Sequence, residues 1–172
     1  MDADLKSRLM EALFGAPLVI NSFRGTLVEA MLAQVLEPDW RWCAADWASH
    51  DFENGDGARL EVKQSATLQS WHEGGFPPNR GRFDIASRKT RWEGVRRIEE
   101  AGRYADLYVF AWHPVVDPAL ADHRKPDQWL FHLVPSEDLP DQQSIALSRI
   151  QAIAPGISIG TVPSQISALL RS

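Results

Sequence analysis

The four residues Asn54-Gly55-Asp56-Gly57 place a reverse turn between two extended segments, and this turn constrains the fold of the chain most strongly. Asparagine, aspartate and glycine accept the backbone conformations that a tight hairpin requires. The segments on either side, residues 49–53 and 58–66, are typical of strands. The sequence therefore predicts an antiparallel hairpin whose register depends on the length of the loop.

The loop length decides which side chains face each other across this hairpin. An odd-numbered loop pairs Glu53 with Arg59 and sets Asp51 directly opposite Glu61. Cross-strand neighbours of this kind have Cβ atoms about 5 Å apart. Because side chains alternate along a strand, Lys63 then shares the face of Glu61. An even-numbered loop breaks the alignment, and the sequence alone leaves both lengths open.

Two carboxylates and a lysine on one patch of sheet suggest chemistry on a phosphate group. Carboxylate oxygens are hard ligands that suit Mg²⁺ or Mn²⁺. Such a metal lowers the pKa of a bound water and stabilises charge on a phosphate during displacement. A lysine beside it can hold a phosphate oxygen or orient the attacking water. Asp51 and Glu61 are the first candidates for ligands, and Asp46 is a second candidate at the less favourable parity.

The remaining pattern predicts an α/β protein with a mixed central sheet flanked by helices, in one domain over residues 1–172. Its core is expected over about residues 22–135, with a helix at 3–13 and helices within 144–170 as additions. The expected elements are a helix at 22–36, extended segments at 40–47 and 49–53, strands at 58–66, 81–86, 106–114 and 128–135, a helix at 92–104, and short helices at 144–154 and 164–170.

Asp51, nine intervening residues and then Glu61-Val62-Lys63 form a pattern that resembles the motif of the PD-(D/E)XK, or restriction-endonuclease-like, nuclease superfamily. The order of expected elements also resembles the core of that family, which is a helix, a three-stranded meander, a helix and a strand. The likeness covers about residues 22–112. One departure is His50, which stands where the family motif has proline.

The resemblance implies a role for each residue of the motif. Asp51 and Glu61 would be metal ligands, with the backbone carbonyl of Val62 as a third, and Lys63 would be the catalytic lysine. Many members add a glutamate from the first core helix, and Glu29 matches that position. Gln64 occupies a position where several such nucleases carry a polar residue near the site. An exposed helical glutamate and a solvated strand face are the alternative interpretations.

The distribution of charge indicates a surface that could face phosphate groups. The formal net charge is −5, but residues 80–103 contain eight basic and four acidic residues, so this window carries +4 and the remainder −9. Concentrated basic charge on an acidic protein favours a local nucleic-acid interface. The alternative is a solvated helix face with ion pairs. The candidate nucleic-acid-binding residues are Arg80, Arg82, Arg88, Lys89 and Arg91.

The sequence thus predicts a Mg²⁺- or Mn²⁺-dependent endodeoxyribonuclease that hydrolyses phosphodiester bonds. Two alternatives stay open: an inactive module of the same fold that binds nucleic acid or a partner protein, and a small scaffold subunit. A homodimer or a partner subunit is compatible with each. No segment approaches the length of a membrane span, and the single cysteine, Cys43, excludes an intrachain disulfide, so a cytoplasmic protein is expected.

Overall fold

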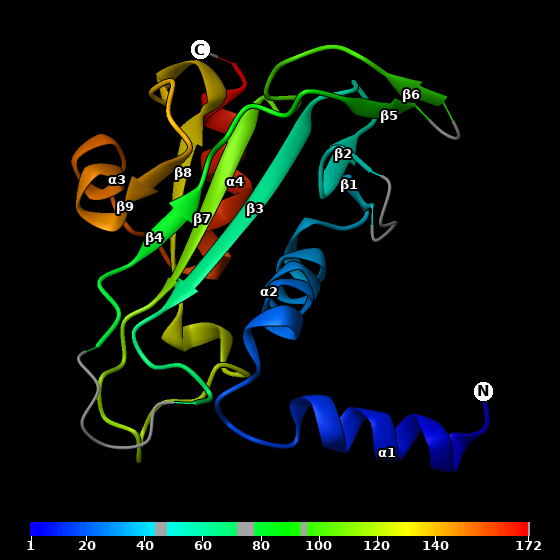
Figure 1. Ribbon diagram of the computed structural model, residues 1–172, viewed down its shortest axis with the longest axis vertical. Coiled ribbons are helices and arrows are strands. Elements are labelled where there is room, and N and C mark those ends of the chain that lie inside the picture. Colours follow the sequence, from blue (N-terminus) through cyan, green and yellow to red (C-terminus); the bar gives the residue numbers. More distant parts are fainter. Residues whose placement is uncertain (44–47, 72–77, 94–95, 172) are drawn as a thin grey trace.

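A computed structural model describes residues 1–43, 48–71, 78–93 and 96–171 of the chain (Figure 1). Its centre is a mixed five-stranded sheet in the order β1-β2-β3-β7-β8. β3 and β7 run parallel, and the other neighbours are antiparallel. The predicted α/β class with a mixed sheet flanked by helices is confirmed. The strands are β1 (Trp40–Trp42), β2 (Phe52–Asn54), β3 (Arg59–Ala66), β7 (Leu107–His113) and β8 (Leu130–Pro135).

The hairpin between β2 and β3 has the odd-numbered loop. Glu53 pairs with Arg59, as predicted. The Gly57 N–H donates to the Asn54 carbonyl at 3.1 Å. Gly57 has a φ of +84°, a backbone conformation in which a residue with a side chain would be strained. The Asn54 side chain also accepts from the Ala58 N–H at 2.8 Å. These features give a three-residue hairpin loop with a left-handed glycine at its end.

Two helices cover one face of the sheet, α2 (Asn21–Leu36) and α4 (Val162–Leu169). The predicted helix at 22–36 is confirmed as α2. Its buried apolar side chains join those that β3, β7 and β8 turn toward this face, and the apolar side chains of α4 complete the cluster. Leu60 and Val62 of β3 belong to this core, so the odd-numbered residues of β3 face the other way.

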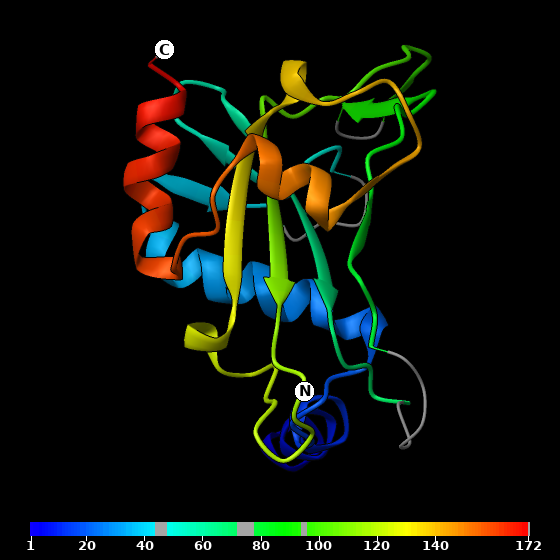
Figure 2. The same ribbon diagram turned by 90° about the vertical axis from the view of Figure 1, so that its left-hand side faces the viewer.

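The opposite face is covered by α3 (Leu147–Ile153) and by a two-stranded sheet of β4 (Arg82–Asp84) with β9 (Ser144–Ala146) (Figure 2). Residues 144–146 were expected to begin a helix, and this prediction is wrong because they pair with β4. Phe83 of β4 packs against Phe110 of β7, with ring centroids 5.2 Å apart. A second cluster of buried side chains therefore covers this face of the sheet. It takes the place of a long helix that would connect β3 to β7.

The helix predicted at residues 92–104 is also wrong. The described residues there form the antiparallel strands β5 (Arg91–Glu93) and β6 (Arg96–Ile98). Between β3 and β7, the described part of the chain thus contains strands and no helix. β3 and β7 nevertheless pair in parallel over seven residues, from Leu60 opposite Leu107 to Ala66 opposite His113.

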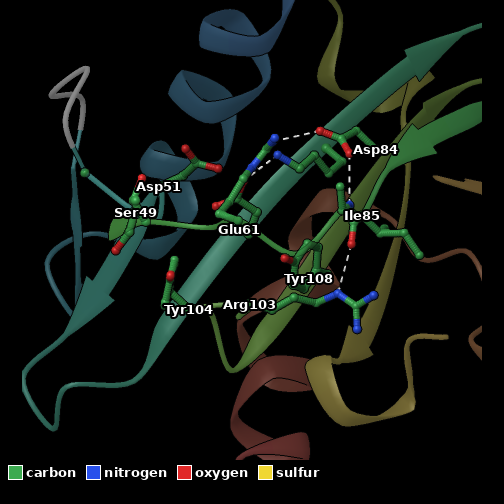
Figure 3. A pocket seen from close by; sticks show the side chains of 13 residues that line it. Ser49, Asp51, Glu61, Asp84, Ile85, Arg103, Tyr104 and Tyr108 are labelled. Carbon is green, nitrogen blue, oxygen red and sulfur yellow. Dashed lines mark hydrogen bonds and ion pairs between the residues drawn. The ribbon is translucent and has the colours of Figure 1, made fainter. Parts of the chain in front are cut away.

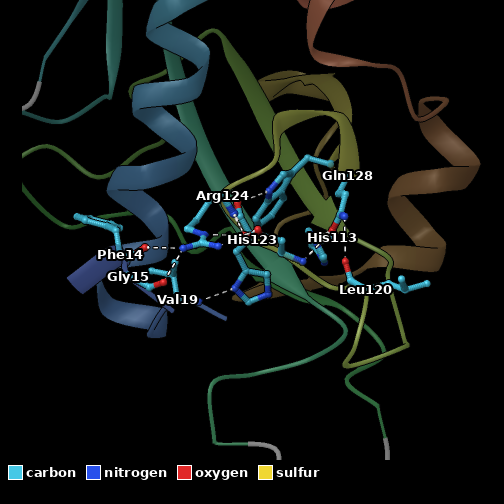
Figure 4. Close-up of polar contacts among 10 residues, drawn as sticks. Phe14, Gly15, Val19, His113, Leu120, His123, Arg124 and Gln128 are labelled. Carbon is cyan, nitrogen blue, oxygen red and sulfur yellow. Dashed lines mark hydrogen bonds and ion pairs between the residues drawn. The ribbon is translucent and has the colours of Figure 1, made fainter. Parts of the chain in front are cut away.

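The N-terminal helix α1 (Ala3–Phe14) agrees with the helix predicted at 3–13, and none of its residues is buried. The chain after it is fixed by residues of the loop between β7 and β8 (Figure 4). The Val19 N–H donates to Nδ1 of the buried His123 at 3.1 Å. Arg124 donates to the Phe14 and Gly15 carbonyls at 3.2 and 2.6 Å. The two contacts anchor the segment that leads into α2.

The outer edge of β8 is partly closed by a bridge in which Phe131 and Ile157 exchange two backbone hydrogen bonds of 2.9 Å each. The described residues also form three short 3₁₀ helices, η1 (Pro126–Gln128), η2 (Ser136–Asp138) and η3 (Ile159–Thr161). None of the helices in the described ranges has the length and apolar character that a membrane span requires.

Candidate functional site

Asp51 lies immediately before β2 and is bound to β3 at two points. Its N–H donates to the Leu60 carbonyl at 2.8 Å, and its carboxylate accepts from the Val62 N–H at 2.6 Å. These contacts place Asp51 against the part of β3 from Leu60 to Val62. The paired register ends at Phe52 opposite Leu60, so the direct pairing of Asp51 with Glu61 stays a prediction.

Asp51, Glu61 and Lys63 line a cavity of about 240 Å³, in which Figure 3 shows the side chains of Asp51 and Glu61. The Lys63 ammonium forms an ion pair with the Glu61 carboxylate, and both side chains are about four-fifths buried, with 20% and 19% exposure. The predicted sharing of one face by these two residues is confirmed. Two carboxylates and an ammonium therefore converge on one partly enclosed polar space.

The Val62 carbonyl lies on the same edge of β3 as the Asp51 carboxylate. The N–H and C=O of one strand residue point to the same side, and the Val62 N–H is bound by Asp51. Glu61 and Lys63 direct their backbone groups toward β7 instead, in keeping with the parallel pairing. Three oxygen donors, from Asp51, Glu61 and the Val62 backbone, are thus available to a hard cation.

The electrostatics of the site are dominated by Asp51. Burial, followed by the negative charges of Glu61 and Glu29, raises the pKa of Asp51 to about 7, against the lowering effects of the Val62 N–H and Lys63. A carboxylate kept from ionising in this way releases its proton when a cation binds beside it. The excess of negative charge at this point is what a divalent metal would neutralise.

Glu29 is half-buried on α2 and accepts a hydrogen bond from the indole Nε1 of Trp42 at 2.9 Å. It does not line the 240 Å³ cavity, but its charge acts on Asp51. Its position is therefore at the margin of the site, where it contributes negative potential.

Gln64 is held against α2 and faces away from Glu61 and Lys63. Its Oε1 accepts from Nε of Arg24 at 2.5 Å, and its Nε2 donates to Oδ1 of Asn21 at 3.1 Å. Arg24 is a residue that we did not single out from the sequence. The sequence feature that could have identified Arg24 is its position on the apolar stripe of the helix, in line with Val28 and Met31. A charged residue at such a position indicates a buried cation.

The candidate nucleic-acid-binding residues Arg80, Arg82, Arg88 and Lys89 are all exposed, and two of them contact other side chains. Arg88 lines the 240 Å³ cavity and pairs with Asp84 at 2.7 Å. Arg82 donates to Ser144 at 2.7 Å, and Arg80 and Lys89 are exposed. The side chain of Arg91 and the whole of Asp46 lie outside the part of the chain that the structure describes.

Tyr108 and Asp84 also line the cavity, and neither was predicted from the sequence. Tyr108 is the partner of Glu61 in the parallel pair β3–β7, so the register of two predicted strands was the signal that could have found it. Burial, followed by the charge of Glu61, raises the pKa of Tyr108 to about 12, and its phenol stays a hydrogen-bond donor at neutral pH. Asp84 enters through β4, and no local pattern indicated it.

A second group of metal-binding residue types lies at the end of β1, just before β2 and within β2. Ligand atoms of Cys43, His50 and Glu53 all lie within 4.8 Å of one another. Thiolate and imidazole ligands favour Zn²⁺ over Mg²⁺. Glu53 already accepts from Arg41 at 2.7 Å and from Arg59 at 3.3 Å, and the two guanidinium groups oppose a cation there. Among the described residues, the Asp51–Glu61 pair is the better site for a hard metal.

We expect Asp51→Asn to raise the midpoint temperature of unfolding by about 5 °C at pH 8 in EDTA, and by less at pH 5. The pKa of Asp51 rises from 3.8 to about 7 on folding, so the folded state binds the proton more tightly. The stability of the wild type therefore falls as the pH rises from about 4 to about 7, whereas asparagine does not titrate. Thermal unfolding followed by circular dichroism measures both midpoints.

The same variant should lose the stabilisation that Mg²⁺ or Mn²⁺ gives the wild type at pH 8. Asp106→Asn is the control for the loss of one carboxylate: Asp106 accepts from the Arg59 N–H at 2.8 Å and lies outside the 240 Å³ cavity. An unchanged or lower midpoint for Asp51→Asn at pH 8 would contradict the electrostatic description of the site.

Comparisons of the chain with protein-family models, with curated proteins and with solved structures gave no match.

Proposed function

We propose that this protein is a metal-dependent nuclease that hydrolyses phosphodiester bonds in DNA. The observation that carries the proposal is the convergence of the Asp51 and Glu61 carboxylates and the Lys63 ammonium on one cavity. The raised pKa of Asp51 has burial as its first cause and the negative charges of Glu61 and Glu29 as the next, and a bound cation would offset these effects. The residues to hold Mg²⁺ or Mn²⁺ are Asp51, Glu61 and Val62 through its carbonyl.

In this proposal the metal, when bound, lowers the pKa of a coordinated water and stabilises the charge that develops on the phosphate. The chain itself supplies position and donors. Lys63 carries three N–H donors at the cavity and can hold a non-bridging phosphate oxygen or orient the attacking water. Tyr108 keeps its proton and can donate a further hydrogen bond to the phosphate. Arg88 at the rim adds positive potential for an approaching strand.

A restriction-endonuclease-like core is part of the same proposal. It is supported by α2 followed by the antiparallel strands β1, β2 and β3, and by β7 running parallel to β3. The described residues between β3 and β7 depart from the pattern, since β4, β5 and β6 stand where the family has a helix. The departure leaves the proposed metal ligands in place because they come from the hairpin.

The test is incubation of the purified protein with supercoiled plasmid, linear duplex and single-stranded DNA, in Mn²⁺, Mg²⁺ or EDTA. We expect cleavage with either metal and none in EDTA. Glu61→Gln should abolish cleavage because a neutral amide replaces one charged ligand. Glu53→Gln is the matched control, since Glu53 lies on the same hairpin but pairs with Arg41 and Arg59.

Two other outcomes would contradict this assignment, one for the metal site and one for the activity. If Glu53→Gln abolishes cleavage and Glu61→Gln does not, the metal belongs to the group around Cys43. Binding of DNA without metal-dependent cleavage of any substrate would favour the inactive nucleic-acid-binding module instead.

A further inference from the structure

A second cavity, of about 610 Å³, adjoins the first along β3. Lys63 and Asp84 line both cavities, so the two spaces meet at these residues. Beyond Leu60, β3 is no longer paired with β2, and the second cavity lies beside this part of the strand, between β4 and the beginning of α2. The two cavities are therefore neighbours along β3.

The wall of this cavity contains Arg24, whose side chain is only 1% exposed. Its guanidinium is held by neutral groups: Nε donates to Gln64 at 2.5 Å and Nη2 to Asn21 at 2.7 Å. Nη1 is buried without a hydrogen-bond partner among the described residues. No carboxylate in the described part of the chain forms an ion pair with Arg24.

A buried guanidinium without an anionic partner is costly, and burial alone lowers the pKa of Arg24 to about 10. A lowered value of this size still leaves the group charged at neutral pH. Fixed hydrogen bonds to two amides orient the fork without neutralising it. Such a group is suited to an anion with several acceptor oxygens, and a phosphate matches the planar guanidinium.

We propose that the second cavity binds a phosphate group of the same nucleic-acid strand that is cut in the first cavity, with Arg24 as the charged contact. The inference rests on the proposed nuclease function for the identity of the strand. Asn21 and Gln64, which hold the Arg24 guanidinium, line the same cavity.

The test is the affinity of wild type and Arg24→Met for three fluorescent single-stranded 12-mers in EDTA, with a 5′-phosphate, with a 3′-phosphate or with neither. Arg24→Met should bind about 10- to 100-fold more weakly, because a charge-assisted contact to phosphate is lost. The slope of log K against log salt should fall by about 0.7. Arg149→Gln, an exposed arginine on α3, is the control for the loss of one positive charge.

An equal loss of affinity for all three oligonucleotides identifies an internal phosphate, and a loss confined to one phosphorylated end identifies a terminal one. Equal affinity of wild type and Arg24→Met for all three would overturn the inference. Asn21→Ala serves if Arg24→Met does not fold, because Asn21 is exposed and orients Nη2. It should weaken binding about threefold to tenfold, and unchanged binding would again overturn the inference.

These measurements separate the two proposals. An Arg24-dependent affinity together with an absence of metal-dependent cleavage would remove the nuclease function and retain the phosphate cavity. Metal-dependent cleavage with no effect of Arg24→Met on affinity would do the reverse.

Discussion

Lys63→Met is expected to lower the rate of metal-dependent DNA cleavage by about 100- to 1,000-fold. Methionine keeps most of the length of the side chain but removes the donors that Lys63 places beside Glu61. Asp51, Glu61 and the Val62 carbonyl stay in position, so the variant should bind Mn²⁺ at least as tightly as the wild type. Single-turnover cleavage of a duplex and calorimetric titration with Mn²⁺ measure the two quantities separately.

Lys125→Met is the matched control, since Lys125 is exposed in the loop between β7 and β8 and lines neither of the two cavities. It should cleave at the wild-type rate. Cleavage by Lys63→Met at that rate would remove Lys63 from the mechanism. A loss of Mn²⁺ binding in the same variant would assign Lys63 a positioning role toward the carboxylates.

Phe110→Ala should lower the free energy of unfolding by about 3–5 kcal/mol. Phe110 is fully buried in the middle of β7 and contacts the rings of Phe83 and Tyr108, with centroids 5.2 and 5.9 Å away. Its removal leaves a cavity between the central sheet and the layer that contains β4. Because small domains are stable by only about 5–15 kcal/mol, this is a large fraction of the total. Urea unfolding followed by fluorescence measures the change.

The control for this variant is Arg97→Ala in β6, an exposed position where the free energy of unfolding should change by about 0.5 kcal/mol or less. A double-mutant cycle with Phe83→Ala should give a coupling of about 0.5–1.5 kcal/mol between the two rings. Additive effects of the two substitutions would mean that β4 does not pack on β7 as described.

The parts of the fold that the sequence predicts correctly are those with local causes. The turn at Asn54 to Gly57 sets its own register, and the apolar stripe of α2 shows in its spacing. The error at residues 92–104 has a physical reason, since arginine and glutamate favour a helix while Gly94 is also a hairpin signal. The pairing of β9 with β4 joins residues about 60 positions apart, and no local pattern encodes such a contact.

The residues of the candidate site also divide into those placed by local sequence and those placed by contacts between distant strands. Asp51, Glu61 and Lys63 are brought together by one hairpin, so their spacing predicted that they lie close to one another, on the condition of an odd-numbered loop. Tyr108 and Asp84 reach the cavity through strands that meet only in the folded protein. Arg24 lies on the apolar stripe of α2, where the helical spacing predicts a buried residue but not a role in binding.

The short outer strands bear on the solubility of the protein. β3 and β7, the two longest strands, lie inside the sheet, while β1 at one edge has three residues and β8 at the other is partly closed by Ile157. An open edge of a long apolar strand is a template for pairing with another chain, and it promotes aggregation. The sequence LYVFAWH of β7 is apolar, carries no acidic residue, lysine or arginine, and contains no proline, which are features of aggregation-prone segments. The strand order keeps it paired on both sides.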